Sequence, residues 1–206
     1  MKSVDRINQW NKRLAAVLLA AGDSSRMGTP KLFMEFSPGV TFMDACVKAF
    51  LDFGCQRIVL VVNGRVFNKL TGLGNQTSSQ VRLVLNKYPE RGRFYSLQCG
   101  LNVVSEQSHV FFHNIDNPFI SKEVLEALAC ANKKADIVCP AYGGRRGHPV
   151  LISRKPMLDI ITEKNQNWIL RDFLKRYENL SVPVSDPNIL ININNPEDYD
   201  KHFGKR

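Results

Sequence analysis

A loop of small and basic residues follows the first hydrophobic segment and has the composition of a phosphate-binding loop. It spans residues 19–31, with the sequence LAAGDSSRMGTPK. Small residues directly after a strand let the backbone approach a ligand closely, and successive backbone N–H groups can surround phosphate oxygens. Arg26 and Lys31 add two positive charges. An ordinary strand-to-helix turn would not need this combination of serine, arginine and lysine, so phosphate binding is favoured.

This loop differs from the two commonest phosphate-binding motifs. Gly22 and Gly28 are six residues apart, and Gly28 precedes Thr-Pro-Lys rather than the Lys-Ser or Lys-Thr pair of a Walker P-loop. The dinucleotide-binding pattern Gly-x-Gly-x-x-Gly is absent as well. The sequence therefore indicates a different class of phosphate site.

Two oxygen-bearing side chains follow hydrophobic segments and could bind a metal ion. Asp116 follows residues 109–115, and Asn194 follows residues 189–193. Mg²⁺ usually takes one or two carboxylates together with substrate oxygens. An asparagine oxygen can also ligate Mg²⁺, although it brings no negative charge. The alternative is that both residues serve local structure, in a turn and at the start of a helix.

Two further groups of polar residues could contact a phosphorylated ligand. Arg91, Gly92 and Ser96 lie at the start of a predicted helix, where backbone N–H groups attract anions. Arg146 and His148 lie in a turn and could contact an acceptor molecule. A solvated loop remains the competing interpretation of the first group, and a structural role that of His148.

Alternating strands and helices are expected to position these residues. Segments typical of strands are residues 14–20, 57–62, 81–85, 109–115, 136–140 and 189–193, and helical patterns occupy residues 42–53, 94–104 and 122–133. This alternation predicts an α/β fold with a mostly parallel sheet covered on both faces. Ligands bind outside the carboxyl ends of such strands, where the polar clusters fall. We expect one domain over residues 1–206, with residues 1–13 as a polar extension.

The composition restricts the expected partners. The chain has 206 residues, of which 44% are hydrophobic and 23% charged, as in ordinary globular proteins. Its formal net charge of +9 favours anionic partners. It contains no basic run of five residues and no nucleic-acid-binding motif, so we expect no nucleic-acid partner. No hydrophobic segment reaches the roughly 18 residues that span a membrane, so we expect a cytoplasmic protein without membrane association.

The loop at residues 19–31 resembles the signature of the MobA-like nucleotidyltransferases, L-A-(A/G)-G-x-x-x-R-M-G-x-x-K. The resemblance covers residues 14–199 and includes motifs at residues 90–101, 116–118, 146–149 and 192–198. It implies a Rossmann-like three-layer sandwich. It also implies the transfer of a nucleotide from an NTP to a small phosphorylated acceptor, with release of pyrophosphate and with Mg²⁺ as cofactor.

The resemblance further implies roles for individual residues. Those implied to be catalytic are Arg26, Lys31 and Asp116, and those implied to hold Mg²⁺ are Asp116 and Asn194. Those implied to bind the nucleotide are Leu19, Ala20, Ala21, Gly22, Ser24, Ser25, Gly28, Arg91, Gly92 and Ser96, with Arg146 and His148 at the acceptor.

Two motifs point to different branches of this family. Ala20-Ala21-Gly22 and the Gly-His-Pro element resemble the molybdenum cofactor cytidylyltransferases, in which Ala-Ala-Gly goes with CTP and Ala-Gly-Gly with GTP. Residues 192–196, Asn-Ile-Asn-Asn-Pro, resemble the guanylyltransferases instead. CTP is favoured. The alternatives are a GTP-dependent or sugar-phosphate nucleotidyltransferase and a nucleotide-binding module without catalytic activity. The oligomeric state is not indicated.

Overall fold

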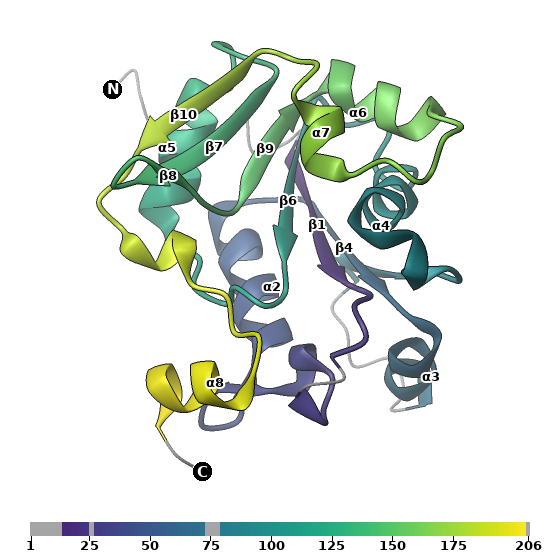
Figure 1. Ribbon diagram of the computed structural model, residues 1–206, viewed down its shortest axis with the longest axis vertical. Helices are drawn as coiled ribbons and strands as arrows, with labels where there is room; N and C mark the ends of the chain where they lie inside the picture. Colours follow the sequence, from purple (N-terminus) through teal and green to yellow (C-terminus); the bar gives the residue numbers. More distant parts are fainter. Residues whose placement is uncertain (1–13, 25–26, 73–78, 205–206) are drawn as a thin grey trace.

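The computed structural model describes residues 14–24, 27–72 and 79–204. They form a Rossmann-like α/β fold, a three-layer sandwich in which a mostly parallel sheet lies between two layers of helices (Figure 1). The expected polar extension, residues 1–13, lies outside the described residues, as do Ser25 and Arg26 of the predicted phosphate loop.

The main sheet has eight strands. Across it lie β5 (Val81–Leu85), β4 (Arg57–Val62), β1 (Leu14–Ala20), β6 (His109–Asn114), β9 (Val150–Ser153), β7 (Ile137–Tyr142) and β10 (Asn179–Pro183), with β8 (Arg145–Arg146) paired to β7. The pairs from β5 to β6 are parallel, as is β7 with β10. Strand β9 runs antiparallel to both of its neighbours. The predicted mostly parallel sheet is therefore confirmed.

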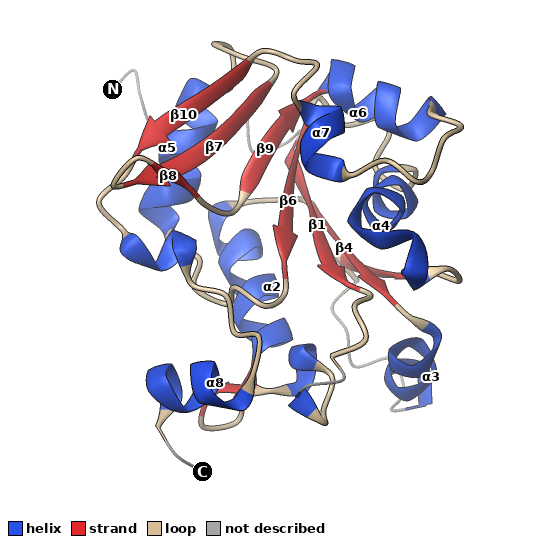
Figure 2. Cartoon of the chain, viewed as in Figure 1, coloured by secondary structure: helices blue, strands red, loops and turns tan. Residues whose placement is uncertain are grey.

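Helices cover both faces of this sheet (Figure 2). The helices on one face are α2 (Phe42–Phe53), α3 (Gly64–Gly72) and α5 (Lys122–Ala131), and those on the other are α4 (Gly92–Leu101), α6 (Arg154–Thr162) and α7 (Leu170–Leu174). Along β1, Ala16 and Leu18 pack toward the first layer, and Val17 and Leu19 toward the second. Burial on both faces explains why this strand is continuously hydrophobic. Among the described helices, none is long and apolar enough to cross a membrane.

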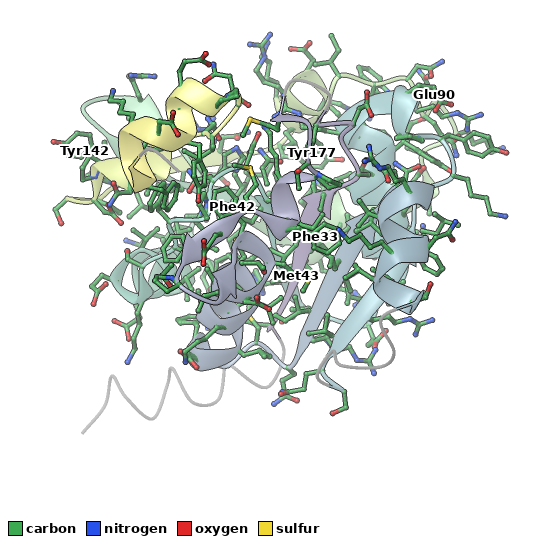
Figure 3. The ribbon with its side chains drawn as sticks, turned by 90° about the horizontal axis from the view of Figure 1, so that it is seen from below. Phe33, Phe42, Met43, Glu90, Tyr142 and Tyr177 are labelled. Carbon is green, nitrogen blue, oxygen red and sulfur yellow. The ribbon has the colours of Figure 1, made fainter. Side chains whose placement is uncertain are left out.

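The remaining elements gather below the carboxyl ends of β1 and β6, as Figure 1 shows. They include the 3-10 helix η2 (Lys31–Phe33), the hairpin of β2 (Glu35–Ser37) and β3 (Val40–Thr41), and the C-terminal helix α8 (Pro196–Phe203). Apolar side chains of β2 and α8 form a separate cluster around Phe42 and Tyr199, whereas Leu32 and Phe33 of η2 pack with the main core. Figure 3 views the molecule from this side, with Phe42 at the start of α2 labelled. This lower region holds several of the predicted site residues.

Local sequence signals explain the bounds of α2. The Thr41 side chain accepts a hydrogen bond from the backbone N–H of Asp44, and the Asp44 carboxylate accepts one from Thr41, so a capping box begins the helix. At its end, Gly54 adopts φ 105°, in the left-handed region that favours glycine. The helix spans the predicted residues 42–53.

The expected strand at residues 189–193 is absent from the described sheet. Its first half belongs to the 3-10 helix η4 (Pro187–Leu190), in which Asp186 accepts a hydrogen bond from Asn188 N. Its second half is extended but has no partner strand in that sheet. The proline at the first helical position favours a helical turn over a strand, so the prediction of a strand was wrong.

Other predicted bounds differ by a few residues. The helix expected at residues 122–133 ends at Ala131, and that expected at residues 94–104 runs from Gly92 to Leu101. Ser121 precedes α5 in an extended conformation, but its side chain makes no capping hydrogen bond. Fraying ends of this kind are the least predictable part of a helix.

Replacing Gly100 by alanine should destabilise the fold by about 1–3 kcal/mol, the usual cost of overpacking. Gly100 lies in α4 against the sheet, where a Cβ would come 2.9 Å from Val61 Cγ2 and closer still to Val17 Cγ1. Gly64→Ala in α3 is the control, since a Cβ there meets nothing within 4 Å. Urea unfolding of both variants tests the prediction, and equal stabilities would contradict it.

Candidate active site

A cavity of about 420 Å³ opens at the carboxyl ends of β1 and β6. Polar and apolar groups from five separate segments of the chain line it. The lining residues are Leu19, Ala20, Ala21, Gly22, Asp23, Ser24, Lys31, Leu32, Arg93, Ser96, Asn114, Ile115, Asp116 and Asn194. Much of the predicted loop, together with Asp116 and Asn194, therefore surrounds one space at the sheet edge where α/β proteins bind ligands.

Three predicted site residues contact one another in this cavity. The Lys31 Nζ lies 3.4 Å from Asp116 Oδ2 and donates a hydrogen bond of 3.0 Å to Asn194 Oδ1. The side chain of Lys31 is 13% exposed and that of Asp116 is 26% exposed, so solvent screens the pair only in part. The other carboxylate oxygen, Asp116 Oδ1, is buried and has no hydrogen-bond partner among the described residues. One acceptor therefore remains available for a ligand.

The backbone fixes Lys31 and Asp116 from either side of the cavity. Lys31 N donates a 3.3 Å hydrogen bond to Ser24 Oγ, which ties the lysine to the loop. Ile115 N donates to Leu19 O at 3.1 Å, so the pairing of β6 with β1 continues up to Asp116. The carboxylate consequently emerges where the strand ends.

Asn194 reaches the cavity without belonging to a strand. The preceding residue, Ile193, donates a 2.7 Å hydrogen bond from its backbone N to Asp116 O. Asn194 N in turn donates to Asp198 Oδ2 at 2.8 Å, and Asp198 N donates to Asn195 Oδ1 at 2.7 Å. The start of α8 therefore holds Asn194 beside Asp116 and Lys31.

Helix α8 is itself anchored by aromatic packing. The Tyr199 hydroxyl donates a 2.8 Å hydrogen bond to Glu35 O, and its ring stacks on Phe203 with the centroids 4.9 Å apart. Phe203 also packs against Phe42 at 5.4 Å between centroids. These contacts connect the C-terminal segment to β2 and α2, and so fix the position of Asn194.

The described part of the predicted phosphate loop has the backbone geometry of a tight turn. Ser24 adopts φ 51° and Gly28 φ 67°, both left-handed, and Met27 N donates to Ser24 O at 2.9 Å. Gly22 lines the cavity, and a Cβ there would meet nothing within 4 Å. Gly28 does not line the cavity, so its placement supports the turn rather than a direct contact.

Asn63 supports this loop, and the sequence analysis missed it. Its Nδ2 lies 3.3 Å from Ala21 O and 3.4 Å from Gly22 O, to which it donates hydrogen bonds. Its Oδ1 accepts one from Val66 N at 3.0 Å and so starts α3. The available signal was its position directly after β4, at the same sheet edge as Asp116.

The side chains at the start of α4 point in two different directions. Arg93 and Ser96 line the cavity, whereas Arg91 does not. The Arg91 guanidinium lies over the ring of Tyr88, 4.4 Å from its centroid, and contacts the Gln166 side chain. The Ser96 hydroxyl donates to Gly92 O at 3.1 Å and accepts a hydrogen bond from Asn86 Nδ2 at 3.0 Å, so both of its roles are already used within the protein. Arg93 therefore takes the place in the cavity that the sequence analysis gave to Arg91.

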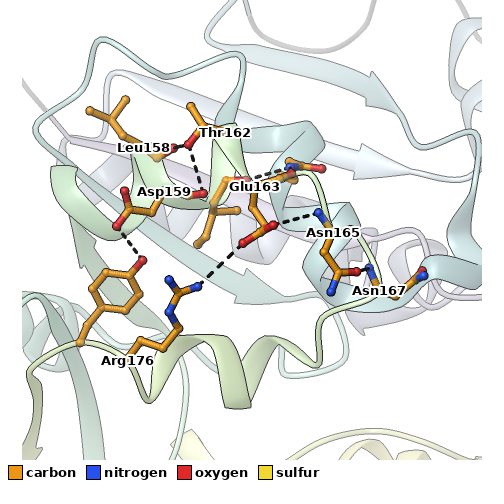
Figure 4. A network of polar contacts seen from close by, with 10 residues as sticks. Leu158, Asp159, Thr162, Glu163, Asn165, Asn167 and Arg176 are labelled. Carbon is orange, nitrogen blue, oxygen red and sulfur yellow. Dashed lines mark hydrogen bonds and ion pairs between the residues drawn. The ribbon is translucent and has the colours of Figure 1, made fainter.

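A turn between α6 and α7 carries Gln166, the partner of Arg91. Glu163 Oε1 accepts a hydrogen bond from Asn165 N at 2.9 Å, and Asn165 Oδ1 accepts one from Asn167 N at 3.1 Å (Figure 4). Arg176 approaches the Glu163 carboxylate at 3.8 Å. This network holds Arg91 on the outer side of α4, away from the cavity.

The two predicted acceptor residues also lie outside the cavity lining. Arg146 contacts Cys139 Sγ and donates a 2.9 Å hydrogen bond to Asn179 Oδ1, on the neighbouring strands β7 and β10. His148 lies behind the cavity wall, with Nε2 3.1 Å from the Nδ2 of Asn114, which does line the cavity. His148 therefore contacts a wall residue and not the cavity itself.

Burial keeps two neighbouring histidines neutral. It lowers the pKa of His113 to about 3, with a further lowering from nearby His148. Burial also lowers the pKa of His148 to about 4, where the Asp116 carboxylate raises it and Arg93 lowers it. Neither ring carries charge at neutral pH, so neither adds to the positive charge of the cavity.

The depressed pKa values predict a loss of stability in acid. Below the ordinary histidine pKa of about 6.5, the unfolded chain binds protons at His113 and His148 that the folded protein does not. Stability is therefore full above this pH and should fall, as pH decreases towards the folded values, by about 1.4 kcal/mol per pH unit for each histidine. Urea unfolding across this range measures the slope.

A histidine substitution separates this effect from general acid sensitivity. His113→Gln should reduce the slope, since glutamine can still donate to Asn117 O, which now lies 2.5 Å from His113 Nε2. The exposed His202→Gln, which replaces the same residue type outside this buried pair, is the control. A slope that is the same in all three proteins would contradict the assignment.

The oxygen ligands in the cavity suit a hard divalent cation. Asp116 supplies a carboxylate with an unpartnered buried oxygen, and Asn194 supplies an amide oxygen. Neither here nor elsewhere in the described residues is a group of three His, Cys, Asp or Glu side chains placed to hold a metal ion. Mg²⁺ commonly takes one or two protein oxygens and completes its shell with water and phosphates. Asp116 and Asn194 therefore fit an ion that a phosphorylated ligand helps to bind.

Known proteins share this fold and about a quarter of the aligned residues. Residues 16–180 match the family described as the MobA-like NTP transferase domain. A molybdenum cofactor cytidylyltransferase of Escherichia coli is 27% identical over 183 residues, which cover 89% of this chain and 92% of that protein. A probable molybdenum cofactor guanylyltransferase of Clostridium perfringens is 25% identical over 165 residues, covering 78% and 77%.

A solved structure supports the fold independently. A Mycobacterium tuberculosis protein crystallised in complex with manganese has a TM-score of 0.70 and 17% identity, covering 94% of this chain and all (100%) of that one. The mostly parallel sheet and the loop after β1 both lie within the matched residues 16–180 or directly beside them. On this evidence the chain belongs to the MobA-like NTP transferase family.

Proposed function

We propose that this chain transfers the nucleotidyl group of an NTP to a small phosphorylated acceptor and releases pyrophosphate. The observation that carries the proposal is the meeting of Lys31, Asp116 and Asn194 beside the loop that follows β1. This arrangement offers cationic, carboxylate and backbone groups to one cavity of about 420 Å³. The names of the relatives support the same reaction class.

CTP is the favoured nucleotide, and a molybdopterin-type compound the favoured acceptor. Ala20-Ala21-Gly22 has the form found in cytidylyltransferases of this family and lines the cavity. The Escherichia coli relative is named as a molybdenum cofactor cytidylyltransferase, whereas the Clostridium perfringens relative is named as a guanylyltransferase. GTP therefore remains the alternative nucleotide. We further propose that residues 1–206 act as one nucleotidyltransferase domain in the cytoplasm.

In the proposed reaction, an acceptor phosphate oxygen attacks the α-phosphorus of the NTP. A new P–O bond forms as the bond between the α-phosphorus and its bridging oxygen breaks, and pyrophosphate leaves with the electron pair. A phosphomonoester is largely dianionic at neutral pH, since its second pKa is about 6, so no general base is needed. In agreement with this, burial keeps His148, behind the cavity wall, uncharged at neutral pH.

The protein's contribution is positioning and charge neutralisation. The backbone of the loop and Ser24 would surround the phosphates, and Lys31 with Arg93 would offset their charge. Arg26 is proposed to assist, although it lies outside the described residues. Asp116 and Asn194 would hold Mg²⁺, which when bound supplies a second counter-charge to the triphosphate.

An acceptor and nucleotide screen tests the proposal. Pyrophosphate release should be measured with each of the four NTPs, Mg²⁺, and either molybdopterin or a sugar phosphate. We expect release with CTP and molybdopterin well above the rate without acceptor. Preference for GTP would reverse the nucleotide assignment, and preference for a sugar phosphate would reverse the acceptor. No release with any combination would indicate a nucleotide-binding module.

A further inference from the structure

We propose that the Lys31 ammonium is the resident cation of the metal site. In the nucleotide-free protein it occupies the place between Asp116 and Asn194 that a divalent ion needs, and it leaves for the triphosphate when nucleotide and metal bind together. Lys31 would thus control the order of binding as well as offset phosphate charge. This inference rests on the proposed function and concerns the regulation of the same site.

The contacts of Lys31 carry the inference. Its Nζ is 3.4 Å from Asp116 Oδ2 and 3.0 Å from Asn194 Oδ1, and the Asp116 carboxylate and the Asn194 amide oxygen are also the candidate metal ligands. Asp116 forms no other ion pair among the described residues, and the lysine side chain is largely buried. A divalent ion bound by the same two side chains would lie beside the ammonium and repel it. The two cations are therefore alternatives.

The local structure lets the ammonium move while the backbone stays in place. Lys31 N is held by Ser24 Oγ at 3.3 Å, and Lys31 O accepts a hydrogen bond from Met34 N at 3.0 Å. Only the flexible side chain beyond Cα must change rotamer, and Lys31 already lines the cavity together with Gly22. Incoming phosphate oxygens would therefore find the ammonium within the same space.

The exchange has a thermodynamic consequence. Without nucleotide, a metal ion must displace an ammonium that keeps its charge but loses its two oxygen partners. With nucleotide, the displaced ammonium gains phosphate partners instead. Metal and NTP should consequently strengthen each other's binding, and by linkage the coupling must be the same in both directions. The free protein should bind divalent ions weakly.

The test measures Mn²⁺ binding to the nucleotide-free protein, with the electron paramagnetic resonance of free Mn²⁺ as the readout. Lys31→Met should bind Mn²⁺ about tenfold more tightly than the wild type. The figure is taken from proton binding, where one adjacent positive charge weakens the affinity of a carboxylate by about tenfold or more. Lys31→Gln is a second variant in case methionine disturbs folding. Wild-type affinity in both variants would overturn the exchange.

A matched charge removal distinguishes exchange from general electrostatics. Arg93 lines the same cavity, but no ion pair joins it to Asp116 among the described residues. Arg93→Met should therefore change Mn²⁺ affinity much less than Lys31→Met, and equal tightening by both would overturn the proposal. Asp116→Asn in the Lys31→Met background should remove the gain. The Mn²⁺ titration contains no nucleotide, so its result tests the exchange alone. Failure of the wild type to release pyrophosphate would instead refute the proposed function.

Discussion

Replacing Lys31 by alanine should lower NTP turnover by about 100- to 1,000-fold, as removal of one group that stabilises transition-state charge commonly does. Lys31 is the cation held beside Asp116 and Asn194 in the cavity, at 3.4 Å and 3.0 Å. Without it, neither the triphosphate nor the departing pyrophosphate would have this counter-charge. Steady-state pyrophosphate release measures the effect.

The same substitution should leave the fold intact. Asp116 is 26% exposed, so water can solvate its carboxylate once Lys31, which is 13% exposed, is removed, and the loss of stability should be about 1 kcal/mol. A change of that size moves the melting temperature by only about 2–4 °C in a protein of this length. Lys48→Ala is the matched control, because it removes an exposed pair with Asp52 in α2, away from the cavity. Near-normal turnover of Lys31→Ala would remove the phosphate role.

The fold is largely predictable because its central strands are buried on both faces. Strands β1, β4 and β5 have the bounds that their hydrophobic segments predict. The reversal at β9 (Val150–Ser153) is not predictable in this way, because burial constrains which residues are apolar and not the direction of the strand. Direction depends on partners, and β9 lies between β6 and β7. Hydrophobic patterns identify strands but not their orientation.

The site is predictable where strand ends determine it. Asp116 lies two residues after the end of β6, so the end of this strand places the carboxylate at the cavity. Asn194 arrives differently, through the hydrogen bond of Ile193 N to Asp116 O and through the start of α8. Such tertiary contacts leave no periodic pattern in the sequence from which they could be predicted. The expectation that Asn194 would lie near Asp116 therefore agrees with the structure for a different reason.

Helix geometry decides which arginine faces the cavity. Arg91 and Arg93 flank one glycine, and either could have pointed inward from the sequence alone. The turn before α4, with Gly92 at φ 80°, directs Arg91 onto Tyr88 and leaves Arg93 at the cavity. Which of the two arginines faces the cavity therefore depends on contacts with other segments. Here the contact is with the loop that carries Gln166.

Substitutions of Asp116 and Asn194 should shift the Mg²⁺ dependence of turnover in opposite directions. Asp116→Ala removes the one carboxylate among the two candidate metal ligands. Turnover should therefore fall by about 100-fold or more even at saturating Mg²⁺. Asn194→Asp adds a second carboxylate to a hard-cation site and should lower the Mg²⁺ concentration for half-maximal activity. Turnover measured against Mg²⁺, alongside melting curves, compares the three proteins.

Asn194→Asp is informative because the new carboxylate would attract Lys31 as well as Mg²⁺. Its position is 3.0 Å from the Lys31 Nζ, so the ammonium also gains from the added charge. A divalent ion gains about twice as much as a monovalent one at equal distance, since Coulomb energy scales with charge. The half-maximal Mg²⁺ concentration should therefore still fall. A rise would mean that Asn194 holds only the lysine, and an unchanged value with lower stability would mean that it only shapes the start of α8.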